Sequence, residues 1–130
     1  MELHIVHQNV EDQSRAVVGV FIEATSKSKF TPSLIPKIRT FLEAKESDTE
    51  PDPEVSTNPL DWLPEDTKKY YRYEGSLTTP DYDENVSWVV LRDSLMISKK
   101  ELMKLIPYLQ HPARMPQPLN RRFVLANFKT

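Results

Sequence analysis

The stretch that decides the fold is Glu2–Asn9, which reads ELHIVHQN. Side chains alternate between the two faces of an extended strand, so Glu2, His4 and Val6 share one face. A carboxylate and an imidazole two residues apart on one face lie within reach of each other. The stretch therefore predicts a strand, with Glu2 and His4 as candidate functional residues.

A second strand is predicted over Ala16–Ile22, the apolar and largely β-branched run AVVGVFI. The residues between the two strands, Asn9–Ser14, are polar and typical of a turn. Two extended runs separated by a short polar turn favour an antiparallel hairpin. Val17 and Val20 should then face opposite sides of the second strand, because successive side chains alternate.

The rest of the chain favours more strands than helices. Strands are predicted over Tyr70–Tyr73 and Val86–Leu91, joined by the polar turn Thr78–Asn85, and a last strand over Phe123–Phe128. This order indicates an α+β class that is mostly β, with a dominant sheet.

Two short helices complete the predicted pattern. The first begins at Thr31–Pro32, with a capping Thr and a Pro at the first helical position. Its apolar residues Leu34, Ile38 and Leu42 recur at helical spacing. The second begins at the capping box Ser98–Glu101.

Length and composition bound the organisation of the chain. Its 130 residues, 38% hydrophobic and 28% charged, are ordinary for one globular domain. We expect residues 1–130 to form a single partial domain, with an exposed acidic loop at 46–59. The chain has no Cys, so it forms neither a disulfide nor a thiolate metal site. No apolar run reaches the roughly 20 residues of a membrane span, and no basic–aromatic pattern indicates nucleic acid.

Five segments carry a resemblance to a known family, and they follow one another in the order in which that family has them. Besides ELHIVHQN they are YYRYEGSLTTP at 70–80, VSW at 86–88, AVVGVF at 16–21 and QPLNR at 117–121. Together they resemble the C-terminal half of an alpha-type carbonic anhydrase. The resemblance implies a partial fold of that family: a twisted, mainly antiparallel sheet with peripheral short helices.

The resemblance implies a role for each matching residue. His4 matches a zinc ligand, Glu2 matches the carboxylate that holds the other ring nitrogen of that ligand, and Thr78 matches the catalytic residue that accepts a hydrogen bond from zinc hydroxide. The substrates of such a site are CO2 and bicarbonate, and the reaction is the reversible hydration catalysed by a carbonate dehydratase, a lyase. The residues that match the substrate-binding pocket are Thr78 and Thr79 on its polar side and Val6, Val17, Leu77, Val86 and Trp88 on its apolar wall.

The chain departs from the family pattern in its metal ligands. The N-terminal half of the family, with the two other zinc His, is absent from this sequence. His7 points to the other strand face from His4 and is expected to be a buried structural residue, while His111 is expected in a loop. A single His binds zinc weakly. We therefore expect the full-length parent to be a zinc enzyme and this chain alone to be an incomplete, inactive portion.

The sequence leaves an alternative open. The chain could be a non-catalytic carbonic-anhydrase-related binding or adhesion module, with a basic C-terminal face formed by Lys99, Lys100, Lys104, Arg114, Arg121 and Arg122. Half a sheet also leaves a strand edge bare, which favours self-association. The compartment stays open, since Tyr70–Pro80 resembles extracellular members while the chain lacks their Cys.

Overall fold

The computed structural model describes residues 1–26, 38, 40, 43–44, 58–108 and 113–129. The chain divides into two compact units. The first unit comprises Met1–Phe21, Pro64–Ser94 and Ala113–Thr130, and the second comprises Ile22–Leu63 and Leu95–Pro112. All residues of the candidate site lie in the first unit.

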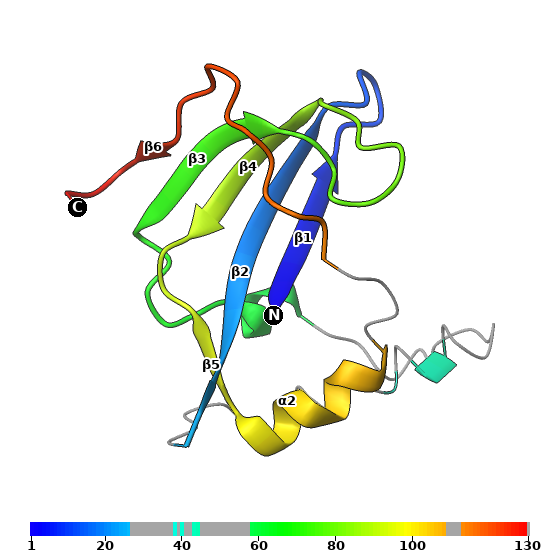
Figure 1. Cartoon of the computed structure of the whole chain (residues 1–130), viewed down its shortest axis with the longest axis vertical. Helices are drawn as coiled ribbons and strands as arrows, with labels where there is room; N and C mark the ends of the chain where they lie inside the picture. Colours follow the sequence, from blue (N-terminus) through cyan, green and yellow to red (C-terminus); the bar gives the residue numbers. More distant parts are fainter. Residues whose placement is uncertain (27–37, 39, 41–42, 45–57, 109–112, 130) are drawn as a thin grey trace. The chain divides into compact units, whose positions relative to one another are not determined.

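The strands run in the order β1-β2-β4-β3-β6 (Figure 1). Their bounds are β1 Glu2–Gln8, β2 Arg15–Thr25, β4 Val86–Leu91, β3 Tyr70–Gly75 and β6 Leu125–Ala126. The pairs β1–β2, β3–β4 and β3–β6 are antiparallel, whereas β2 and β4 are parallel. The predicted mostly β class is confirmed, and the sheet is mixed.

The predicted hairpin is confirmed, with an unbroken register from Glu2↔Phe21 to Gln8↔Arg15. Two backbone hydrogen bonds close the turn: Asn9 N–H donates to Ser14 O at 2.9 Å, and Gln13 N–H donates to Asn9 O at 3.0 Å. Its polar side chains add to them, since Asn9 Oδ1 accepts from Glu11 N–H at 2.9 Å. The register fixes which residues of β1 lie beside which residues of β2.

The core of the first unit centres on Val17, Val86, Trp88 and Val90, each at most 8% exposed. In β4 the core residues alternate with half-buried ones, as one covered face of a strand requires. Tyr71, Tyr73 and Leu77 pack against this cluster from β3 and from the loop that follows it. Burying a Val side chain contributes about 1.5–3 kcal/mol, so these strands hold the first unit together.

The second unit contains the end of β2, which pairs in parallel with β5 (Leu95–Ser98) from Ile22↔Leu95 to Thr25↔Ser98. The sequence did not predict β5. Helix α2 (Lys99–Leu105) follows directly, and the predicted cap is confirmed because Ser98 Oγ accepts from Glu101 N–H at 3.2 Å. Two 3-10 turns complete the unit: η1 at Pro59–Trp62 and η2 at Ile106–Tyr108.

Two predictions fall largely outside the described residues. The helix that begins at Thr31–Pro32 is one of them. The acidic loop at 46–59 is the other, except that its last residue, Pro59, begins η1.

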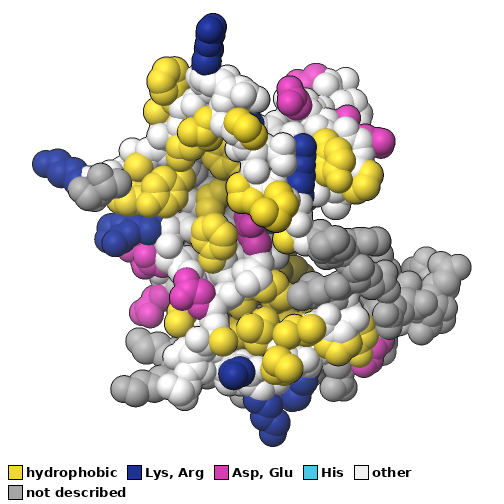
Figure 2. Space-filling view, in the orientation of Figure 1, with side chains coloured by type: hydrophobic (Ala, Val, Ile, Leu, Met, Phe, Trp, Pro, Cys, Tyr) yellow, Lys and Arg dark blue, Asp and Glu magenta, His cyan; other side chains and the backbone are white. Residues whose placement is uncertain are grey.

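The predicted last strand, Phe123–Phe128, is wrong in its length. Only Leu125 and Ala126 pair with β3. At the next residue the ladder is only half kept: Asn127 N–H still donates to Tyr70 O at 3.3 Å, but Tyr70 N–H donates to the side-chain atom Asn127 Oδ1 at 2.9 Å. Asn127 Nδ2 donates to Lys68 O at 2.7 Å. The surrounding segment leaves hydrophobic side chains on the surface (yellow in Figure 2), among them Met115, Leu119, Phe123 and Leu125.

The expectation that His7 is buried is also wrong. His7 is exposed, and so is Ala16, its partner in the register. The described residues of the first unit leave this end of that sheet face uncovered.

Candidate functional site

The centre of the candidate site is the pair His4 and Glu2 on β1. His4 Nε2 lies 3.1 Å from Glu2 Oε1, as expected for side chains two apart on one strand face. The Nε2 atom is buried and has no hydrogen-bond partner in suitable geometry. Glu2 Oε1 therefore lies close to Nε2 without forming a hydrogen bond to it. A carboxylate behind one ring nitrogen orients a His whose other nitrogen binds a metal.

Gly19 makes room for this pair from the neighbouring strand. It lies opposite His4 in the register, and a Cβ there would come within 3.1 Å of Glu2 Oε1 and 3.3 Å of Val90 Cγ2. A larger residue would therefore displace the carboxylate. The sequence identified Gly19 only as part of a matching segment.

Trp88 links His4 to the loop that bears the two threonines. Its ring meets the His4 ring edge-on, with centroids 4.7 Å apart at 75°. On its other side the Trp88 Nε1–H donates to Ser76 O at 3.0 Å. The same side chain thus contacts the metal-ligand candidate and fixes the start of the 76–83 loop.

Tyr73 stacks on Trp88: the two rings are nearly parallel, and their centroids lie 6.1 Å apart. Gly75 permits this stacking, since a Cβ there would lie 2.9 Å from Tyr73 Cε2 and 3.1 Å from Trp88 Cδ1. Burial raises the pKa of the Tyr73 phenol, and the Glu2 carboxylate raises it further. The phenol therefore favours its neutral form in the folded chain.

The loop that bears Thr78 and Thr79 is closed by backbone hydrogen bonds. Leu77 N–H donates to Asp83 O at 2.9 Å, and Tyr82 N–H donates to Thr79 O at 3.0 Å. Asp81 and Tyr82 both have a positive φ, at 55° and 51°. Both threonines are exposed, so their hydroxyls are accessible at the turn.

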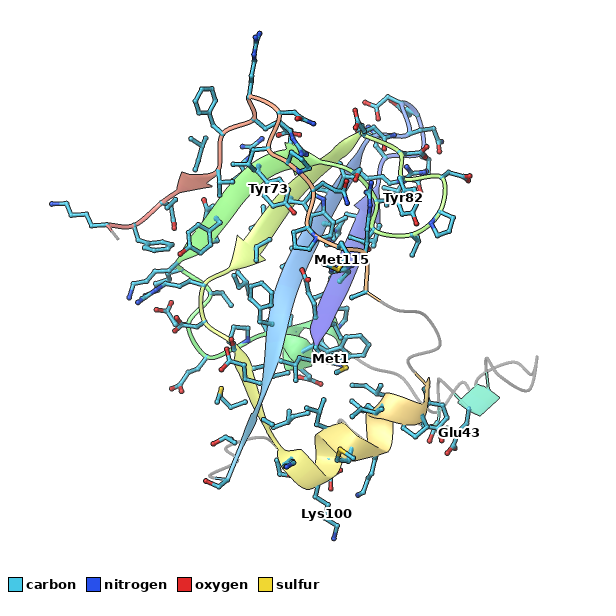
Figure 3. All side chains as sticks on the ribbon, in the orientation of Figure 1. Met1, Glu43, Tyr73, Tyr82, Lys100 and Met115 are labelled. Atoms are coloured by element: carbon cyan, nitrogen blue, oxygen red, sulfur yellow. The ribbon has the colours of Figure 1, made fainter. Side chains whose placement is uncertain are left out.

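Arg114 holds the same loop from the C-terminal segment. Its Nη1 donates to Ser76 Oγ at 2.9 Å and to Leu77 O at 3.3 Å, and its guanidinium lies 4.1 Å over the Tyr82 ring. Figure 3 shows Tyr82 and Met115, the neighbour of Arg114, where the two segments approach each other. The sequence placed Arg114 on a basic face and gave no signal of this role.

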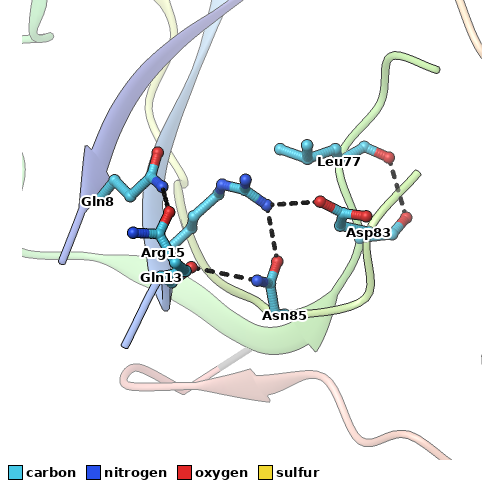
Figure 4. A network of polar contacts seen from close by, with 7 residues as sticks. Gln8, Gln13, Arg15, Leu77, Asp83 and Asn85 are labelled. Atoms are coloured by element: carbon cyan, nitrogen blue, oxygen red, sulfur yellow. Dashed lines mark hydrogen bonds and ion pairs between the residues drawn. The ribbon is translucent and has the colours of Figure 1, made fainter. Parts of the chain in front are cut away.

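Arg15 joins the hairpin to the far end of the loop (Figure 4). Its Nη1 donates to Asp83 Oδ2 at 2.9 Å and to Asn85 Oδ1 at 3.0 Å. Asn85 Nδ2 in turn donates to Gln13 O at 3.1 Å, and Gln13 accepts from Gln8. These contacts tie β1, the hairpin turn and the threonine loop into one polar network that sequence reasoning missed.

The residues predicted to form an apolar wall differ in exposure. Val17, Val86 and Trp88 are at most 2% exposed and belong to the core, whereas Val6 is 55% exposed. Leu77 is half-buried beside that core. All five lie in the first unit, with Val6 on the same strand as Glu2 and His4.

The donor set of the described residues does not fit a structural or catalytic zinc site. Such a site needs three or four protein ligands in a tetrahedral arrangement. Among the described residues no group of three or more His, Cys, Asp or Glu could hold a metal ion. The chain has three His in all: His7 lies on the other face of β1 from His4, and His111 lies outside the described residues.

The basic residues considered for a binding face fall into both units. Lys99, Lys100 and Lys104 belong to α2, where Lys104 pairs with Glu101 at 2.8 Å. Arg122 donates to Leu119 O and Pro118 O, each at 2.8 Å. Arg114 and Arg122 therefore make contacts within the chain itself.

Comparison with known proteins identifies the class to which this fold and site belong. The family model of eukaryotic-type carbonic anhydrases matches residues 1–128. The chain therefore belongs to the carbonic anhydrase family.

Particular relatives make the likeness specific. The chain is 33% identical to mouse carbonic anhydrase 6 and to alpha carbonic anhydrase 3 of Arabidopsis thaliana, covering 98% of this chain and 45% and 46% of those proteins. A carbonic anhydrase of Chlamydomonas reinhardtii in complex with acetazolamide is 28% identical, with a TM-score of 0.76, over 98% of this chain and 56% of that one. The alpha-carbonic anhydrase of Thermovibrio ammonificans with the inhibitor sulfanilamide is 29% identical, with a TM-score of 0.70, over 95% and 52%. The chain thus spans about half the length of these relatives.

Within the described part of the chain, no helix is both long and apolar enough to cross a membrane.

Proposed function

We propose that this chain contributes one zinc ligand and the threonine loop to a carbonic anhydrase that hydrates CO2 reversibly to bicarbonate. We propose further that the 130-residue chain alone is inactive, because its described residues bring no further metal ligands to His4. The observation that carries the proposal is the 3.1 Å contact between His4 and Glu2, with the His4 ring against Trp88. Family membership supplies the reaction class.

The residues of this chain support the proposed site by positioning its parts. Glu2 lies behind Nε2 of His4, which leaves the Nδ1 atom as the nitrogen for a metal. Trp88 restrains the imidazole from one side and bonds Ser76 O from the other. The hydroxyls of Thr78 and Thr79 stand at an exposed turn, where they are free to donate and accept hydrogen bonds.

In a complete site, zinc lowers the pKa of a bound water so that hydroxide forms near neutral pH. The donors of the described residues do not by themselves form that site. Its residues therefore supply ligand orientation and the hydrogen-bonding loop, and the metal chemistry depends on ligands from elsewhere.

Stopped-flow CO2 hydration tests the inactivity of the isolated chain. The expected rate equals the buffer background, with or without added zinc, and His4→Ala leaves it unchanged. Hydration above background that a chelator removes and His4→Ala abolishes would contradict this part of the proposal.

A chimera tests the proposed contribution. The first half of the Chlamydomonas reinhardtii relative, joined to this chain, should bind zinc and hydrate CO2. His4→Ala should remove both properties, while Thr78→Ala should lower hydration and leave zinc bound. Val10→Ala, in the exposed hairpin turn, is the matched control. A folded, zinc-loaded chimera without hydration would argue for a non-catalytic module.

A further inference from the structure

Arg15 begins β2 on the sheet face that carries the candidate site. The register places Gly19 beside His4 and Arg15 beside Gln8, and residues at every second position share one face of a strand. Arg15 lies four residues from Gly19 along β2, about 13 Å at the usual strand rise. Its side chain is therefore too far along the strand to contact His4. It contacts the 76–83 loop, which bears the two threonines.

The guanidinium of Arg15 holds the end of this loop. Its Nη1 donates to Asp83 Oδ2 at 2.9 Å and to Asn85 Oδ1 at 3.0 Å (Figure 4). The backbone adds a third contact, since Arg15 N–H donates to Asn85 O at 3.2 Å. The Arg15 side chain is 18% exposed, against 48% for Asp83. A guanidinium shielded in this way keeps more of its attraction for a carboxylate than one surrounded by solvent.

Asp83 also bonds the residue that precedes Thr78. Its backbone oxygen accepts from Leu77 N–H at 2.9 Å (Figure 4). From the other side, Arg114 donates to Leu77 O at 3.3 Å. The two peptide groups of Leu77 are thus both held, and only the contact with Asp83 involves the residue that Arg15 binds.

The hairpin turn supports Arg15 and its partners. Asn85 Nδ2 donates to Gln13 O at 3.1 Å, so the side chain that accepts from Arg15 is itself bonded to the turn. Gln13 has a φ of 60°, in the left-handed region that a residue with a side chain seldom adopts. Such a conformation persists where the surrounding contacts determine it. The turn therefore has a defined shape from which Asn85 and Arg15 hold the loop.

We propose that Arg15 is a positioning residue for the Thr78 hydroxyl and acts through Asp83 and Leu77. The guanidinium fixes the Asp83 side chain, the Asp83 carbonyl fixes the Leu77 amide, and the Leu77 amide fixes the backbone that leads into Thr78. The role of the Thr78 hydroxyl rests on the proposed function. The restraint on the loop does not, because it consists of contacts within this chain.

Amide hydrogen exchange of the chain itself tests the restraint. Arg15→Met keeps an unbranched stem and removes the guanidinium, so exchange of the Leu77 amide should become about three- to tenfold faster, as for a lost and partly screened bond between charged groups. Asp83→Ala should have the same effect. Because Arg15 acts through Asp83, the double variant should exchange no faster than either single one. Arg72→Met, which breaks an exposed 3.6 Å ion pair on β3, should leave the Leu77 amide unchanged.

The chimera with the first half of the Chlamydomonas reinhardtii relative tests the effect on catalysis. Arg15→Met should lower kcat, expressed per bound zinc, about three- to tenfold and leave KM unchanged, since a displaced hydroxyl weakens the transition state and not substrate binding. Asp83→Ala should lower kcat by the same factor, and the double variant should lower it no further. Arg72→Met should keep the full rate. A merely structural role would reduce the zinc content or the folded fraction and leave kcat per zinc unchanged.

The outcomes separate this proposal from the proposed function. An unchanged Leu77 exchange rate in Arg15→Met, or additive effects in the double variant, would overturn the restraint. A faster exchange rate with an unchanged kcat in an active chimera would overturn the positioning of Thr78. An unsubstituted chimera that binds zinc without hydrating CO2 would contradict the proposed function and with it the catalytic role of Arg15, while the exchange rates would decide the restraint on the loop independently.

Discussion

Strands β3 and β4 and the C-terminal segment Ala113–Lys129 lie in the same unit, yet they are held by different forces. β4 buries Val86, Trp88 and Val90, and its stability comes from apolar burial. The C-terminal segment leaves most of its large apolar residues exposed, apart from the half-buried Phe128, whose ring meets the Tyr71 ring edge-on with centroids 5.1 Å apart. It also attaches through Arg and Asn side chains that bond backbone oxygens. Burial positions the His4 side of the site, whereas polar side chains position the loop.

The largest expected effect is on the buried side of this comparison. Trp88→Ala should lower the free energy of unfolding by about 3–5 kcal/mol, because it removes a core ring that contacts both His4 and Tyr73. Urea denaturation of the purified chain measures the change. Phe123→Ala removes a ring that is 82% exposed and should change stability by less than about 0.5 kcal/mol. If both variants lost the same free energy of unfolding, β4 and the C-terminal segment would not differ in how they are stabilised.

A smaller effect is expected from the polar contact of the C-terminal segment. Arg114→Ala should cost about 1–2 kcal/mol, since it removes two hydrogen bonds and the contact with the Tyr82 ring. Arg114→Lys should not restore the loss, because an ammonium lacks the planar fork. Arg72→Ala, which breaks an exposed 3.6 Å ion pair with Glu74, is the control and should cost less than about 1 kcal/mol.

Amide hydrogen exchange locates the effect of Arg114. Faster exchange in Arg114→Ala should be confined to the 76–83 loop, where Leu77 N–H and Tyr82 N–H are bonded. Uniformly faster exchange over β3 and β4 would contradict a role restricted to the loop.

The smallest effect concerns pH. Burial and the Glu2 carboxylate raise the pKa of Tyr73 in the folded chain, so unfolded chains ionise first as pH increases. Stability is therefore fully present below the ordinary Tyr value of 10.0 and declines as pH rises toward the folded pKa. Denaturation at several pH values from 8 upward should show this decline, and Tyr73→Phe should reduce it. Tyr71→Phe keeps Tyr73 and should keep the decline; a decline unaltered in Tyr73→Phe would assign it to other groups.

The sequence predicted the elements whose local pattern agrees with their environment. The hairpin, β3, β4 and the capped start of α2 follow from alternation, β-branched runs and the Ser98 cap. The final strand was overestimated, because at Asn127 the side-chain oxygen, and not a backbone carbonyl, accepts from Tyr70 N–H. No local sequence pattern reveals that a side chain will take the place of a backbone acceptor.

The candidate site was predictable only where one strand contains both partners. Glu2 and His4 meet because they are two residues apart on β1. Arg114 lies 38 residues from Ser76 in the sequence, and Arg15 lies 68 from Asp83. From the sequence alone, the charges of Arg114 and Arg15 predict solvent-exposed side chains. The hydrogen-bond acceptors that they contact come from distant parts of the chain. Gly19 and Gly75 likewise acquire a meaning only from side chains on neighbouring strands.

The central claim is that this chain contains one part of a carbonic anhydrase site and not a complete one. Zinc analysis of the purified chain, after dialysis against zinc and then against metal-free buffer, tests it most directly. We predict far less than one zinc per chain, and no difference between the unchanged chain and His4→Ala. One tightly held zinc per chain, lost in His4→Ala, would contradict the account.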